Sequence, residues 1–191
     1  ICKDILYKKM LKEQPDVDWV LWLDGDLLLD GRLLVDNNLE KLCAKLDEKN
    51  VDLPCFGHYN LWRSDTFYRV DQGYHNLHGR WFPLWGKPKN KYFDAIPGLH
   101  HGQVPQGTTK AAIVDVSVIH RGFATDEYIV EKYLRYKELG QKGWDLDRLI
   151  DEETLTVEHL PISILPKWFE LSDIADPTTK PKLIELFTNI P

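Results

Sequence analysis

Apolar residues along the chain fall into runs and stripes that predict alternating helices and strands. The run at residues 19–23 has no polar break, which is typical of a strand buried on both faces. Residues 4–14 carry an apolar stripe at helical spacing, and Pro15 ends that stripe just before the run. We therefore predict a helix over residues 4–14 and a buried strand over residues 19–23.

The same patterns predict further elements downstream. Strands are predicted at residues 53–63, 67–70, 80–85 and 111–120, with a polar connection at 71–79. Helices are predicted from a cap at 36–38 to about residue 50, at 126–136 and at 180–187. Residues 86–109 are rich in proline, glycine and lysine, which indicates a long loop. We expect one α/β domain over residues 1–155 and a carboxyl-terminal extension, residues 156–191, that packs on it.

Two carboxylates, Asp24 and Asp26, follow the first predicted strand and are separated only by Gly25. An EF-hand calcium loop would need an oxygen ligand at Leu28 and a glutamate at Val35, so that interpretation is excluded. Asp and Gly are also common in simple turns. The third interpretation is a metal and diphosphate site, because hard divalent ions often use one or two carboxylates and leave other positions to water and phosphate.

A histidine stands at the end of the strand predicted at 111–120. His120 is followed by Arg121 and by a helix for which Thr125 is a good N-cap. Imidazole is an acceptable ligand for Mn²⁺ beside a carboxylate, so a histidine here can approach an ion held by Asp26, while a lone histidine is otherwise a surface or core residue. Arg121 would either contact a diphosphate oxygen or be solvated.

The order of helix, break, buried strand and Asp-Gly-Asp closely resembles the metal-binding DxD segment of family 2 glycosyltransferases with the GT-A fold. The strand ending in His120 and the helix after it resemble the late strand of that group, which ends in a metal-binding histidine, and the helix that follows. The resemblance covers roughly residues 3–151, with a divergent middle. It implies a Rossmann-like mixed sheet flanked by helices and an Mn²⁺ or Mg²⁺ ion held by Asp26 and His120. It also implies that Asp24 is directed toward the ribose or a metal-bound water.

Such an enzyme would be an inverting, hexosyltransferase-like protein that moves a sugar from a nucleotide-diphosphate donor to a hydroxyl acceptor. Relatives often carry a His-Glu pair in the acceptor-side segment, and its glutamate is a candidate catalytic base. This sequence has His101 where that glutamate would stand. The base, which must reach the acceptor hydroxyl, therefore stays open among His101, Asp71 and Asp94.

The resemblance also implies that strands binding the nucleotide base and ribose precede residue 1. The chain would then be the carboxyl-terminal part of a longer enzyme and would lack the first strands of its sheet. We expect residues 1–191 alone to bind nucleotide sugars poorly and to expose an unpaired sheet edge beside the strand at 19–23.

Composition bears on partners and location. A net charge of −6 over 191 residues argues against a general nucleic-acid-binding protein, which would show a basic face. No apolar stretch reaches the roughly 18 residues of a membrane span. The three cysteines lack metal-ligand spacing, which favours thiols in the cytoplasm. Two other functions stay open: a metal-dependent phosphotransferase or hydrolase, and a non-catalytic domain that binds carbohydrate through the aromatic residues of the middle of the chain.

Overall fold

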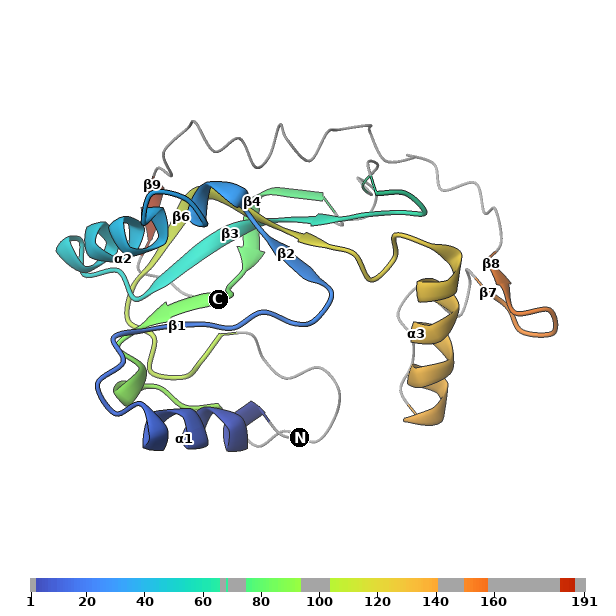
Figure 1. Ribbon diagram of the computed structural model, residues 1–191, viewed down its shortest axis with the longest axis horizontal. Coiled ribbons are helices and arrows are strands. Elements are labelled where there is room, and N and C mark those ends of the chain that lie inside the picture. The colour runs from blue at the N-terminus through green and yellow to red at the C-terminus, as the bar shows by residue number, and fades with distance from the viewer. Residues whose placement is uncertain are drawn as a thin grey trace.

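A five-stranded mixed sheet forms the centre of the fold, in the order β2-β6-β3-β4, with β9 also paired to β6 (Figure 1). The parallel pair is β3 (Leu53–Asn60) and β6 (Ala111–His120). Three strands run antiparallel to their neighbours: β2 (Leu27–Leu29), β4 (His75–Trp81) and β9 (Leu183–Phe187). The α/β class with a mixed sheet, predicted from the sequence, is confirmed.

The computed structural model describes residues 3–65, 68, 75–93, 104–140, 150–157 and 183–187. Its helices are α1 (Lys3–Glu13), α2 (Asn38–Glu48) and α3 (Asp126–Glu138), with short 3-10 turns at Gly31–Leu33 and Pro88–Asn90. In Figure 1, α1 and α2 lie toward one end of the sheet and α3 toward the other. All three helices were predicted. Thr125 caps α3 as expected, because its side chain accepts a hydrogen bond from the Tyr128 N–H.

The first predicted strand is shorter and less buried than its apolar sequence suggests. β1 (Trp19–Leu21) pairs with β5 (Leu84–Gly86) in a separate two-stranded sheet, and only Val20 of β1 is buried. The Trp19 ring lies over Gly86, where an added Cβ would come within 2.9 Å of it. The predicted bounds of 19–23 were therefore too long, whereas both faces of β1 do pack against the core, Val20 on one side and the partly buried Trp19 and Leu21 on the other.

Two other element predictions were wrong. Residues 71–79 were expected to be a polar connection, but β4 already begins at His75. The segment expected as a helix at 180–187 contains β9, which pairs with β6. Because β3 occupies one edge of β6, both β2 and β9 pair along the other edge. A short apolar run such as Leu183–Phe187 suits either conformation, and the available strand edge decides in favour of β.

Most aromatic residues described in the middle of the chain are core residues. Trp85 is fully buried, and its ring packs against Phe93 and Tyr7 with ring centroids 5.5 and 6.1 Å apart. Trp62 packs on α3 and on the hairpin of β7 (Ile150–Asp151) and β8 (Thr156–Val157). These aromatic residues are therefore core residues and are not exposed for stacking on a sugar.

A buried ion pair links the start of β3 to the loop after β5. Lys91 Nζ donates to Asp52 Oδ2 at 2.6 Å, and both side chains are almost completely buried. The backbone N–H groups of Thr109 and Lys110 donate to the same carboxylate. Burial alone raises the pKa of Asp52, but the hydrogen bonds from Lys91 and the two N–H groups outweigh it and leave the pKa lowered.

Lys91→Met should destabilise the fold by about 3 kcal/mol at pH 7, because it leaves the Asp52 carboxylate buried without its cation. A carboxyl with a lowered folded pKa stabilises the protein above its unfolded pKa of about 3.9, and this contribution is lost as the pH falls through the folded pKa. The variant should therefore lose less stability, relative to the parent, at pH 3 than at pH 7. Urea denaturation at both pH values is the measurement, and an equal loss at both would contradict this role of the pair.

Candidate functional site

The Asp-Gly-Asp motif lies in a tight turn between β1 and β2. The Leu27 N–H donates to the carbonyl of Asp24 at 3.0 Å, which closes the turn. Asp24 is exposed, whereas Asp26 is partly buried. A Cβ added at Gly25 would meet nothing within 4 Å, so the space beside the turn is open. The simple turn and the ligand site are thus compatible descriptions of the same residues.

Pairing of β2 with β6 brings Asp26 and His120 together. Leu27 lies opposite His120 in the sheet, and the Arg121 N–H donates to the Asp26 carbonyl at 2.8 Å. As a result Asp26 Oδ2 lies 3.0 Å from His120 Nε2, although the residues are 94 positions apart. The hydrogen bond with His120 holds the pKa of Asp26 well below its usual range; burial opposes this shift and Lys132 adds to it.

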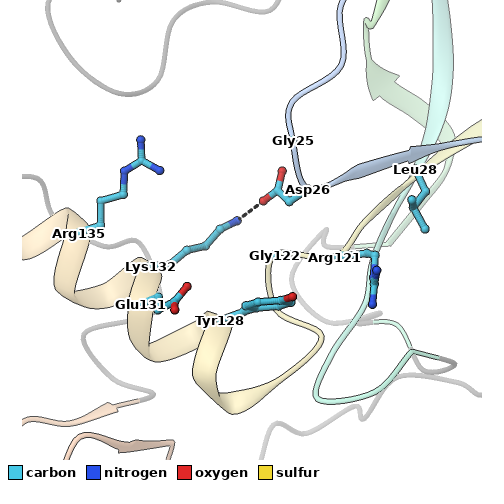
Figure 2. A pocket seen from close by; sticks show the side chains of 9 residues that line it. All are labelled: Gly25, Asp26, Leu28, Arg121, Gly122, Tyr128, Glu131, Lys132 and Arg135. Atoms are coloured by element: carbon cyan, nitrogen blue, oxygen red, sulfur yellow. Dashed lines mark ion pairs between the residues drawn. The ribbon is translucent and has the colours of Figure 1, made fainter.

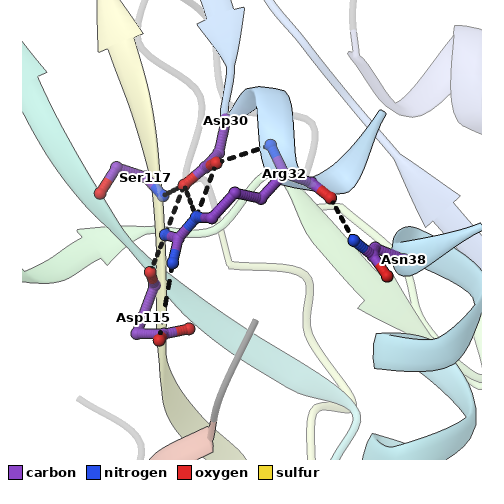
Figure 3. Close-up of polar contacts among 5 residues, drawn as sticks. All are labelled: Asp30, Arg32, Asn38, Asp115 and Ser117. Atoms are coloured by element: carbon purple, nitrogen blue, oxygen red, sulfur yellow. Dashed lines mark hydrogen bonds and ion pairs between the residues drawn. The ribbon is translucent and has the colours of Figure 1, made fainter. Parts of the chain in front are cut away.

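A buried polar network fixes β2 against β6 (Figure 3). Asp30 follows β2 directly and is fully buried; its backbone N–H donates to the Ser117 carbonyl at 3.1 Å, and its carboxylate accepts from the Ser117 N–H at 3.2 Å. The Arg32 guanidinium donates to both Asp30 oxygens and also pairs with Asp115, with Nη1 and Oδ2 3.6 Å apart. Because β2 has only three residues, this network helps to hold the preceding turn in register with the end of β6.

The ammonium of Lys132 occupies the space between Asp26 and His120. Lys132 Nζ lies 2.9 Å from Asp26 Oδ2 and 2.8 Å from His120 Nε2. It also lies 4.6 Å from the centre of the Phe123 ring. Gly122 makes room for this group, since an added Cβ there would overlap the ammonium and lie 2.6 Å from Asp26 Oδ2 and His120 Nε2. The sequence analysis did not identify Lys132.

The other ring nitrogen of His120 is held by Asn60. His120 Nδ1 lies 2.6 Å from Asn60 Oδ1, while the Asn60 amide nitrogen faces His58 Nδ1 at 3.5 Å. With the amide in this orientation, His120 donates its Nδ1–H to Asn60, which orients the ring so that Nε2 faces Asp26 and Lys132. His58 stacks on Trp81 with ring centroids 4.3 Å apart, and burial lowers the pKa of His58 to about 3, so that ring stays neutral.

The Asp26 and His120 ligand atoms suit a divalent ion in spacing. Two adjacent ligands of an octahedral ion with bonds of about 2.1 Å lie about 3.0 Å apart, and Asp26 Oδ2 and His120 Nε2 are 3.0 Å apart. No cluster of three or more His, Cys, Asp or Glu side chains with metal-binding geometry occurs among the described residues. Mg²⁺ and Mn²⁺ would therefore take their remaining ligands from water and phosphate. The pair fits such an ion only when the Lys132 ammonium has moved away.

A pocket of about 380 Å³ opens beside this cluster, between the Asp-Gly-Asp turn and α3 (Figure 2). Asp26 and Glu131 are its acidic residues, and Arg121, Lys132 and Arg135 are its cations. Arg121 also forms an ion pair with Asp65, with Nη2 and Oδ1 2.9 Å apart. The remaining lining residues are Gly25, Leu28, Gly122 and Tyr128. Three cations therefore line the pocket, of which Lys132 is paired with Asp26 and Arg121 with Asp65.

The predicted site residues fall into three groups. Asp26, His120 and Arg121 are brought together at the pocket or its edge. Asp24 is not among the described residues that line the pocket. Its carboxylate interacts with Lys3, and burial lowers the pKa of Lys3 to about 8. The candidate bases Asp71 and His101, together with Asp94, fall outside the described residues.

No family model, curated protein or solved structure matches this chain. Within the described ranges, no helix combines the length and the hydrophobicity needed to cross a membrane. The function therefore has to be inferred from the geometry of the site and from the motifs that form it.

Proposed function

We propose that this chain is the metal-binding and acceptor-side part of a glycosyltransferase, which moves a sugar from a nucleotide-diphosphate donor to a hydroxyl acceptor. One observation carries the proposal. Asp26 and His120, predicted as partners from opposite parts of the sequence, converge at 3.0 Å beside a pocket lined by Arg121, Lys132 and Arg135. That combination supports a site for a divalent ion together with a phosphorylated ligand.

The cations of the pocket would bind and orient the donor diphosphate. Negative charge develops on the diphosphate as the glycosidic bond breaks, and positive groups already in place stabilise that charge without reorganisation. Arg121 and Arg135 face the pocket from its two sides (Figure 2). Leu28 and Tyr128, both partly exposed, add an apolar wall against which the C–H face of a sugar would pack.

Asp26 and His120 would hold Mn²⁺ or Mg²⁺, with Asn60 orienting the His120 ring through Nδ1. When bound, the ion would act as a Lewis acid that neutralises the leaving diphosphate. Asp24 would interact with the ribose or with a water on the ion. The catalytic base of the inverting reaction would be Asp71, His101 or Asp94.

His120→Ala should raise the Mn²⁺ concentration needed for half-maximal activity by about 10- to 100-fold, because it removes a ligand supplied by a separate strand. The measurement is a manganese titration of sugar transfer by the full-length protein, together with a melting curve of the variant. If His120 were only a packing residue, the melting temperature would fall while the manganese dependence stayed the same.

Product analysis tests the class of reaction. The full-length protein is incubated with UDP-, GDP- and dTDP-sugars, Mn²⁺ and a panel of hydroxyl acceptors, and its products are separated. Sugar transfer releases nucleoside diphosphate and a glycoside. Release of inorganic phosphate or nucleoside monophosphate without a glycoside would instead identify a hydrolase or phosphotransferase. Carbohydrate binding without consumption of any donor would identify a non-catalytic module.

A further inference from the structure

Lys132 has an unusual position for a surface lysine on a helix. Its side chain reaches from α3 across to the Asp-Gly-Asp turn, and only 22% of it is exposed (Figure 2). If Lys132 only formed an ion pair, a contact with the Asp26 carboxylate would be enough. Here the ammonium lies at hydrogen-bond distance from both Asp26 Oδ2 and His120 Nε2, at 2.9 and 2.8 Å.

The surroundings of the ammonium match those of a bound cation. A carboxylate oxygen of Asp26 and the Nε2 atom of an imidazole that Asn60 orients both lie at hydrogen-bond distance from it. Gly122 leaves the space that the ammonium fills. A divalent ion bonded to Asp26 and His120 at about 2.1 Å would need much of that same space. The two cations therefore exclude each other, both by volume and by repulsion between their charges.

We propose that Lys132 is an internal cation that fills the Asp26–His120 site in the absence of a divalent ion and is displaced into the adjacent pocket when the ion binds. This inference rests on the proposed function for the identity of the ion. The displaced ammonium stays beside Arg121 in the cationic pocket, where it meets the diphosphate that enters with the ion. Lys132 is thus a positioning residue: it competes with the metal for Asp26 and His120, but it strengthens binding of the diphosphate that accompanies the metal.

Isothermal titration of the purified chain with MnCl₂ tests the competition. Lys132→Met removes the internal cation and keeps the apolar stem, so Mn²⁺ should bind about tenfold more tightly than to the parent, as expected for the loss of a partly buried ion pair. Arg135→Met is the matched control, because it removes the same charge from the same helix and pocket without a contact to Asp26 or His120. Its manganese affinity should stay within about threefold of the parent.

A second titration tests the displacement. Inorganic pyrophosphate in excess MgCl₂ should bind more weakly to Lys132→Met than to the parent, although the same variant binds Mn²⁺ more tightly. A purely structural lysine would not move the two affinities in opposite directions. Lys132→Gln repeats both titrations with a polar side chain, in case the methionine variant does not fold.

The outcomes separate this inference from the proposed function. Equal manganese affinity in the parent and both Lys132 variants would overturn the competition and leave the glycosyltransferase proposal standing. Unchanged pyrophosphate affinity in the Lys132 variants would overturn the displacement into the pocket. No manganese binding in any of these proteins would overturn the Asp26–His120 ion site, and the inference with it.

Discussion

Asp26→Asn should lower metal-dependent sugar transfer by a factor on the order of 100 or more while leaving the fold intact. Asparagine keeps the size and one oxygen of the side chain but removes the negative charge that would hold the ion. In the structure that charge is balanced by the Lys132 ammonium at 2.9 Å. The substitution therefore leaves a net positive site, which repels a divalent ion even though every backbone contact of the turn is retained.

The measurement is the rate of transfer by the full-length protein at saturating Mn²⁺, with a melting curve to check the fold. Asp16→Asn is the control, because it removes the same charge from a carboxylate that is 99% exposed and pairs with Lys89 instead of the residues of the site. That control should keep its rate. Activity of the Asp26 variant within a few-fold of the parent would remove Asp26 from the site.

The convergence of Asp26 and His120 was predicted only through the resemblance to the DxD segment and the late strand of GT-A glycosyltransferases. The strand at 111–120 was predicted with its observed bounds, and its last residue is His120. The three residues after Asp26 form β2, which the sequence analysis did not predict as a separate strand. Antiparallel pairing of β2 with the end of β6 was therefore invisible, and only the resemblance placed the two side chains together.

Lys132 was missed for a different reason. Lysine on the helix after a strand is ordinarily a solvated residue, and the helical pattern alone gives it no special place. Its role depends on how α3 docks, which is decided by packing of Ile129 and Tyr133 against Trp62 and the β7–β8 hairpin. The one local signal was Gly122, whose missing side chain makes room for the ammonium.

The error at β9 has the same origin as the error at β1. Local hydrophobicity predicts that a segment is buried, but it does not predict which other segment packs or pairs with it. β9 is a strand because β2 pairs only with the last residues of β6, which leaves the first part of the same edge of β6 free to pair with β9. β1 is short because its described pairing partner, β5, has only three residues. In both cases the deciding interaction is with a segment more than 60 positions away in sequence.

Arg32→Met should destabilise the protein by about 4 to 5 kcal/mol, near the upper end for breaking a buried ion pair. The Asp30 side chain is 0% exposed and that of Arg32 is 9% exposed. The substitution therefore leaves the Asp30 carboxylate in the interior without its cation. Arg32 also binds Asp115, and that contact is lost too. Methionine has a similar length and no charge, so the loss reflects the unpaired carboxylate more than an empty space.

Chemical denaturation gives the free energy of unfolding for this variant and for Lys89→Met, the matched control. Lys89 pairs with Asp16 at 3.7 Å in an exposed position, and loss of such a pair costs about 0 to 1 kcal/mol. A similar small loss in the Arg32 variant would show that the buried network does not hold β2. If the network does hold β2, any folded fraction of the Arg32 variant should also bind Mn²⁺ more weakly, because the turn that carries Asp26 depends on the register of β2 against β6.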